Sequence, residues 1–243
     1  MQLSSTESKL LYAERWKEHL SKSGIVQQKL LFPRLYDYLG DLKGQDALDI
    51  GCGNGWSTQV LIDNKASNIH AIDYNRVLLE DAKQNFSKNV NFLECDFSKG
   101  LPFSSHSFNI VLCHMVFMSV NDTLVDKVLK ESARILKPNG RLIATVVHPI
   151  WYLFVSQRTN TPAQERLNSY LNTEMIPTNS LPGVDNYERY RRSIGTYSLA
   201  FKDAGFLHFL EEIRLEEFPG IPERYKDYLG FPLFAIYVGR VSA

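Results

Sequence analysis

The sequence has no excess of either charge, since 27 Lys and Arg balance 27 Asp and Glu among 243 residues. Proteins that bind long polyanions usually carry a basic surplus, so the composition argues against nucleic acid as the substrate. Cysteine is scarce: Cys52, Cys95 and Cys113 are an odd number, and none belongs to a C-x-x-C pair. A disulfide framework is therefore not expected, and a reducing compartment is favoured.

Long apolar runs are also missing. No run reaches the roughly 18 residues that cross a bilayer, and the N-terminus lacks the apolar region of a secretory signal. We therefore expect a cytoplasmic protein that does not enter a membrane. Hydrophobic residues make up 44% and charged residues 22%, a mix typical of a globular protein. The length predicts a single domain, 1–243, that carries an insertion.

Short apolar runs alternate with amphipathic segments through the middle of the chain. The runs predict strands at 45–50, 68–73, 90–94, 108–113 and 141–147, and the segments between them predict helices at 56–64, 75–87 and 121–137. A helix at 195–204 and strands at 206–217 and 233–241 follow. This order predicts an α/β fold with a doubly wound, mostly parallel seven-stranded sheet. We expect the last two strands to pair antiparallel at one edge.

Two segments stand outside this alternation. Residues 1–40 show helical spacing with a break at Ser23-Gly24, and we expect them to form an N-terminal helical cap. Residues 149–193 hold four prolines and the cluster YERYRR. They predict a lid with one or two helices, inserted between the fifth and sixth strands.

A glycine-rich turn, Asp49-Ile50-Gly51-Cys52-Gly53-Asn54-Gly55, follows the first predicted strand. Ligands of open parallel sheets bind at the carboxyl ends of the strands, where glycines let the backbone approach them and helix amides face them. A dinucleotide site requires G-x-G-x-x-G, but the sixth position counted from Gly51 is the bulky Trp56. NAD and FAD are therefore disfavoured.

The segment LDIGCGNG resembles the first motif of the class I S-adenosylmethionine-dependent methyltransferases. Asp73 at the end of the second strand, Glu94-Cys95-Asp96-Phe97 after the third and ILKPNGRL before the fifth extend the resemblance over about 30–147. Ala204-Gly205-Phe206 matches more loosely. The resemblance implies a Rossmann-like methyltransferase fold and S-adenosylmethionine as cofactor, released as S-adenosylhomocysteine.

The resemblance also implies roles for individual residues. Asp73 would bond both ribose hydroxyls, and Asp96 would meet the adenine amino group. Asp49 would contact the ligand, directly or through water. Each of the three acids has a plainer alternative: Asp73 as a helix cap, Asp96 as a turn residue, and Asp49 as a cap of the glycine turn. The full set of predicted cofactor-binding residues is Asp49, Gly51, Cys52, Gly53, Asp73, Tyr74, Cys95, Asp96, Phe97, Cys113 and His114.

The fourth strand ends in Cys113-His114-Met115. Methyltransferases that act on amino groups of nucleic acid bases often carry Asn/Asp-Pro-Pro-aromatic here, and its lack argues against base methylation. The spacing of the cysteines and histidines fits no zinc pattern, so no metal is expected.

The fifth strand ends in His148-Pro149, followed by Trp151, as in related small-molecule methyltransferases. His148 is the candidate general base and a candidate substrate contact, with a purely structural role as the alternative. Aromatic residues of the cap and lid either close over a flat acceptor or only pack the lid against the sheet. With His148, the predicted substrate-binding residues are Tyr12, Trp16, Trp151, Tyr187 and Tyr190.

The sequence thus predicts an S-adenosylmethionine-dependent methyltransferase. Its expected acceptor is a small aromatic or heterocyclic molecule, methylated on N or O and less readily on C. Two alternatives stay open: a protein or RNA methyltransferase, and a non-catalytic scaffold that binds the cofactor.

Overall fold

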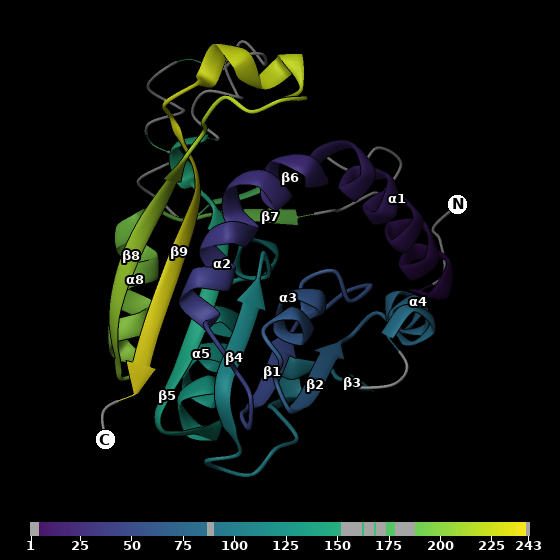
Figure 1. Cartoon of the computed structure of the whole chain (residues 1–243), viewed down its shortest axis with the longest axis vertical. Helices are drawn as coiled ribbons and strands as arrows, with labels where there is room; N and C mark the ends of the chain where they lie inside the picture. The colour runs from purple at the N-terminus through teal and green to yellow at the C-terminus, as the bar shows by residue number, and fades with distance from the viewer. Residues whose placement is uncertain are drawn as a thin grey trace.

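The computed structural model of the chain describes residues 5–86, 90–151, 162, 168, 174–177 and 188–241. Its centre is a seven-stranded sheet in the order β3-β2-β1-β4-β5-β9-β8 (Figure 1). All neighbours pair in parallel except β9, which is antiparallel to both β5 and β8. The strands of this sheet are β1 (Asp46–Ile50), β2 (Asn68–Asp73), β3 (Val90–Glu94), β4 (Phe108–His114), β5 (Leu136–Val147), β8 (Phe206–Arg214) and β9 (Pro232–Val241).

The predicted fold class is confirmed, including the antiparallel pair at one edge. Most predicted strands are found within one or two residues of their expected bounds. The fifth begins earlier, at Leu136, because the Lys137–Gly140 segment continues the strand through a register shift opposite Phe108 and Ile110. Asn139 takes a positive φ of 64° there. The preceding helix therefore ends at Ile135 rather than at 137.

Helices cover both faces of the sheet (Figure 1). Apolar residues of α2 and α3 form one core with one face, and apolar residues of α5 and α8 form the core of the other. The helices and single turns are α1 (Ser5–Val26), η1 (Gln27–Leu31), α2 (Phe32–Leu39), α3 (Thr58–Asp63), α4 (Arg76–Phe86), η2 (Phe97–Lys99), η3 (Phe117–Ser119), α5 (Asp122–Ile135), α8 (Ile194–Asp203) and η5 (Glu223–Tyr228). Among the described residues, none of the helices combines the length and apolar character that a bilayer span requires.

The predicted break at Ser23-Gly24 is wrong, because α1 runs through both residues to Val26. A Cβ on Gly24 would lie 3.3 Å from Cζ2 of Trp56. Gly24 therefore allows the helix to approach the indole ring rather than ending the helix. The irregularity comes later, where η1 is a π-helical turn and Phe32 N–H donates to the Gln27 carbonyl. Pro33, just after it, has no N–H to donate to an α-helical partner.

Several segments gather at the carboxyl ends of the parallel strands (Figure 1). They are α1 with η1, the two-stranded antiparallel sheet of β6 (Glu174–Pro177) and β7 (Glu188–Arg191), and the segment around η5. The pair β6–β7 belongs to the predicted lid, whereas the helices expected within 149–193 fall largely outside the described residues. The η5 turn was not predicted, and it follows a strand that ends at Arg214 instead of 217.

Candidate functional site

The glycine turn lies between the end of β1 and the start of α3. Gly51, Gly53 and Gly55 have φ of 71°, 56° and 86°, which side chains rarely adopt. A Cβ on Gly51 would lie 2.4 Å from Val116 Cγ2, and one on Gly55 would lie 2.6 Å from Phe86 Cε2. Glycine is therefore required twice over, by conformation and by space.

Asp49 lies under this turn and is fully buried. Ser57 Oγ and Thr58 Oγ1 donate to its Oδ2 at 2.8 and 2.6 Å. Burial raises the pKa of Asp49 to about 7, and the neighbouring charge of Asp73 acts in the same direction. Its Oδ1 is buried and accepts no hydrogen bond from any described residue. An orphaned buried oxygen is costly, so this atom marks a place for a donor from a ligand or water.

Asp73 ends β2 and is buried beside the same turn. Its Oδ2 accepts from the Gly53 amide and its Oδ1 from the Asn75 amide, both at 2.8 Å. The cap of α4 is Asn75, whose Oδ1 accepts from the Val77 amide at 3.0 Å. The capping role considered for Asp73 therefore belongs to Asn75, and the Asp73 carboxylate is oriented towards the turn.

Asp96 lies in the loop after β3 and caps η2. Its Oδ1 accepts from the backbone amide of Ser98 at 3.1 Å and from the Ser98 hydroxyl at 2.6 Å. These hydrogen bonds hold the pKa of Asp96 below its ordinary value. The side chain is exposed and ionised at the carboxyl end of the sheet. Asp96 therefore acts as a turn residue in this loop, and its contact with adenine stays a prediction.

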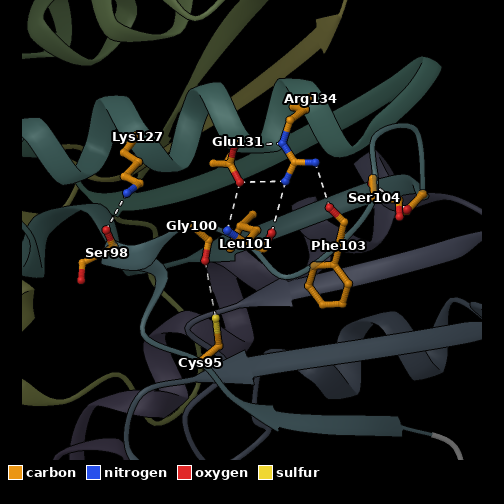
Figure 2. A network of polar contacts seen from close by, with 10 residues as sticks. Cys95, Ser98, Gly100, Leu101, Phe103, Ser104, Lys127, Glu131 and Arg134 are labelled. Atoms are coloured by element: carbon orange, nitrogen blue, oxygen red, sulfur yellow. Dashed lines mark hydrogen bonds and ion pairs between the residues drawn. The ribbon is translucent and has the colours of Figure 1, made fainter.

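Helix α5 holds this loop in place (Figure 2). Glu131 Oε2 accepts from the Leu101 amide at 3.0 Å, and Arg134 donates to the carbonyls of Leu101 and Phe103 at 3.2 and 2.8 Å. Glu131 and Arg134 also pair with each other at 2.8 Å. The Arg134 hydrogen bond lowers the pKa of Glu131 to about 2. Glu131 and Arg134 thus form a two-residue clamp on the later part of this loop, at Leu101 and Phe103, which sequence reasoning did not find.

The remaining predicted cofactor contacts differ in exposure. Cys52, Cys95, Cys113 and Phe97 are buried, and burial raises the pKa of all three thiols, so they remain protonated packing groups. Tyr74, next to Asp73, is 46% exposed and available to cover a ligand. Within the described part of the chain, no three His, Cys, Asp or Glu side chains converge as metal ligands would.

His114 ends β4 and is buried. Its Nε2 lies 3.0 Å from Gln27 Oε1, and its Nδ1 lies 2.8 Å from Thr145 Oγ1. Burial lowers the pKa of His114 to about 3, so the ring is neutral. The ring centroid lies 5.7 Å from that of Phe32 and 6.2 Å from that of Trp56. Its side chain therefore joins the cap to the sheet, and its predicted contact with the cofactor stays a prediction.

His148 follows β5 and is also buried. Its Nδ1 accepts from the Ile150 amide at 3.2 Å, which leaves the ring proton on Nε2, 2.8 Å from Glu212 Oε1. Burial lowers the pKa of His148, and the Glu212 carboxylate opposes that shift. Both ring nitrogens are engaged, so a base role would require the Ile150 hydrogen bond to break. The catalytic role remains a prediction.

The predicted substrate-binding aromatics are spread over the cap. Trp151 stacks on Tyr225 with centroids 5.6 Å apart and meets Tyr228 edge-on at 5.0 Å, both from η5. Sequence reasoning missed these tyrosines, although YKDY could have suggested them. Tyr12 lies half-buried on α1, whereas the Trp16 side chain and all of Tyr187 lie outside the described residues.

Tyr190 lies on β7, and the buried guanidinium of Arg192 is 5.2 Å from its ring centre. The same guanidinium pairs with Asp122 and donates to the Phe117 carbonyl at 2.6 Å. Arg192 therefore ties the end of the lid to η3 and α5.

Residues 48–144 match the family model described as a methyltransferase domain. The chain is 34% identical over 111 residues to demethylmenaquinone methyltransferase of Lactococcus lactis subsp. lactis (strain IL1403), which is 43% of either protein. It is 32% identical over 155 residues to malonyl-[acyl-carrier protein] O-methyltransferase of Halalkalibacterium halodurans, which is 55% of either. The chain thus spans about half the length of these curated relatives.

Solved structures share the fold over a longer range. An S-adenosylmethionine-dependent methyltransferase from Mesorhizobium loti superposes with a TM-score of 0.64 at 19% identity, covering 86% of this chain and 96% of the other. The [4+2]-cyclase SpnF superposes with a TM-score of 0.58 at 18% identity, covering 86% and 81%. The family match spans the glycine turn, Asp73 and Asp96. Residues 48–144 are thus similar to the methyltransferase domain family, and the solved structures share the fold of the chain.

Proposed function

We propose that this protein transfers a methyl group from S-adenosylmethionine to an N or O atom, less readily a C atom, of a small aromatic or heterocyclic acceptor. The observation that carries the proposal is the pair of buried carboxylates at the glycine turn. Asp49 keeps an unpartnered oxygen there, and Asp73 is oriented by the Gly53 amide. A cationic ligand with hydroxyl and amine donors suits such a place.

In this proposal, different residues of the chain bind different parts of the cofactor. Asp49 and the turn amides would hold the amino acid part of the cofactor, Asp73 the ribose, and Asp96 with Tyr74 and Phe97 the adenine. S-adenosylmethionine supplies a methyl group on a positively charged sulfur, which is already prepared to leave. The protein then has to orient the acceptor and exclude water.

A small acceptor is supported by the surroundings of the strand ends. Trp56, Phe32 and Met115 pack in one apolar cluster, in which the first two lie beside His114 at the end of β4. The zero net charge of the chain gives no general attraction for nucleic acid. The named substrates of two relatives are a menaquinone precursor and a malonyl group on a carrier protein. The second keeps a protein-borne acceptor open as the alternative.

Neither buried histidine presents a free basic nitrogen. We therefore favour an acceptor that needs no strong base. A phenol can ionise before the transfer, and a neutral amine can attack with its lone pair and lose a proton to water afterwards. His148 would then orient the start of the lid through Ile150 and Glu212. The base role predicted for it is the competing mechanism.

The fold alone does not fix the reaction, since a cyclase shares it. Incubation with methyl-labelled S-adenosylmethionine and a panel of phenols, quinols, heteroaromatic amines, carrier-protein thioesters, proteins and RNA tests the proposal. Label in a small phenol, quinol or amine is the expected result. Label only in protein or RNA would contradict the small-molecule acceptor and favour a macromolecular one. Binding of S-adenosylhomocysteine without transfer to any of them would favour the scaffold.

A further inference from the structure

Gln27 is a buried polar side chain that neither the sequence motifs nor the cofactor site uses. It is 8% exposed and opens the π-helical turn η1. π-helical turns are rare and recur at functional sites. The turn brings the Gln27 carboxamide against His114 at the end of β4.

The hydrogen bonds around His114 fix which way this carboxamide faces. Gln27 Oε1, which can only accept, lies 3.0 Å from His114 Nε2, so His114 Nδ1 is left to accept from the Thr145 hydroxyl at 2.8 Å. The neutral ring then carries its proton on Nε2 and donates to Gln27 Oε1. The –NH₂ group of Gln27 is thereby turned away from the histidine. It donates to none of the described residues, and it is not among the fully buried unpartnered atoms.

The location of Gln27 agrees with a role at the reacting centre. Leu112 pairs with Asp49 in the neighbouring strand, and His114 comes two residues after Leu112. The side chains of Asp49 and His114 therefore lie on the same face of the sheet. Val116, two residues after His114, packs directly on Gly51. Phe32 and Trp56 stand beside the His114 ring, with their own centroids 4.7 Å apart. The Gln27 carboxamide is therefore held by His114 at the carboxyl end of β4, where two aromatic rings flank that histidine.

We propose that Gln27 is an acceptor-positioning residue whose –NH₂ group binds a phenolate or carbonyl oxygen of the methyl acceptor, with His114 and Thr145 holding it in that orientation. The inference rests on the proposed function, and it narrows the acceptor class to ring compounds that carry such an oxygen. The hydrogen bonds from Thr145 through His114 to Gln27 transfer no proton. They orient the two N–H groups of the Gln27 carboxamide. The oxygen that these groups bind then fixes the orientation of the acceptor ring.

The test uses 4-nitrophenolate, whose visible absorption shifts when its oxygen accepts hydrogen bonds, and protein saturated with S-adenosylhomocysteine. Gln27→Glu keeps an oxygen for His114 Nε2 but loses both N–H donors, and Gln27→Met loses them without adding charge. Gln84→Glu, at an exposed position of α4, makes the same chemical change away from the site. Calorimetry with S-adenosylhomocysteine and melting curves accompany each variant.

We expect wild type and Gln84→Glu to bind 4-nitrophenolate equally, and both Gln27 variants to bind it about tenfold to hundredfold more weakly. Their affinity for S-adenosylhomocysteine should stay within about twofold of wild type. Unchanged phenolate binding in the Gln27 variants, or none in wild type, would overturn the inference. A parallel loss of S-adenosylhomocysteine affinity would make Gln27 a cofactor residue and overturn it too. Failure of wild type to bind S-adenosylhomocysteine would instead count against the proposed function.

A second readout needs no acceptor. Nitrogen NMR of the histidine rings should show His114 neutral and protonated on Nε2, in wild type and in Gln84→Glu. Protonation on Nδ1 would mean that the carboxamide is reversed and its oxygen faces the acceptor. The donor role would then be excluded, whatever the phenolate titration gave.

Discussion

The Gly53 amide donates a 2.8 Å hydrogen bond to the carboxylate of Asp73, so the end of β2 holds the glycine turn that follows β1. The Asn75 amide holds the other oxygen at the same distance. Two neighbouring parallel strands thus share one polar contact at their carboxyl ends. The contact explains how an acid at the end of β2 organises the turn, and the ribose contact that we propose would be a second use of the same carboxylate.

Asp73→Asn tests that double use. The amide keeps one oxygen for a backbone donor but loses the charge and the paired acceptors that a diol needs. We expect affinity for S-adenosylhomocysteine to fall about tenfold to hundredfold. Asp126→Asn, exposed on α5, is the matched control. Equal affinities in calorimetry would restrict Asp73 to a role in the turn.

Asp49 makes stability depend on pH. Burial raises its pKa to about 7 in the folded protein, from 3.8. Folding is therefore favoured by this group below its unfolded pKa, and the contribution is lost as pH rises through about 7. Asp49→Asn, neutral at every pH, should flatten this dependence and stabilise the ligand-free protein at about pH 8. Urea unfolding at about pH 5 and pH 8 measures it. A parallel pH dependence in wild type and variant would show that Asp49 is not desolvated.

The Glu131–Arg134 clamp on the loop after β3 gives a pH dependence of the opposite sign. The Arg134 hydrogen bond lowers the pKa of Glu131 to about 2 from 4.5, so its contribution is present above about 4.5 and lost as pH falls towards 2. Glu131→Gln should cost about 1–3 kcal/mol at about pH 7 and less at about pH 3. It should also weaken cofactor binding through the loop that carries Asp96 (Figure 2). A cost that does not shrink in acid would contradict the account of this pair.

His148→Ala separates the two roles of that side chain. Because the variant leaves the Ile150 amide without its acceptor, we expect the free energy of unfolding to fall by about 1–3 kcal/mol. A general base would instead show a loss of turnover of roughly 10²–10⁴, shrinking as rising pH deprotonates the acceptor. Glu212→Gln, which keeps an oxygen for Nε2, is the companion variant. Normal turnover and normal melting in His148→Ala would defeat both roles.

Much of the fold was predictable because the central strands of the sheet, such as β1 and β4, are buried on both faces and read as short apolar runs. The glycine turn, Asp73 and Asp96 were predictable because each sits at a strand end. Long-range contacts were not: Gln27 meets His114 across 87 positions, and Glu131 meets Leu101 across 30. Gly24 was misread for the same reason, since its partner Trp56 lies in another element. The η1 turn depends on Pro33 and on packing, which periodicity does not report.

The most direct test of the central claim is calorimetric titration of the wild-type protein with S-adenosylhomocysteine and, separately, with NAD. The two buried carboxylates and the glycine turn predict saturable binding of S-adenosylhomocysteine at one site per chain, a higher melting temperature in its presence, and no binding of NAD. Binding of NAD with no response to S-adenosylhomocysteine or S-adenosylmethionine would contradict the assignment of this site.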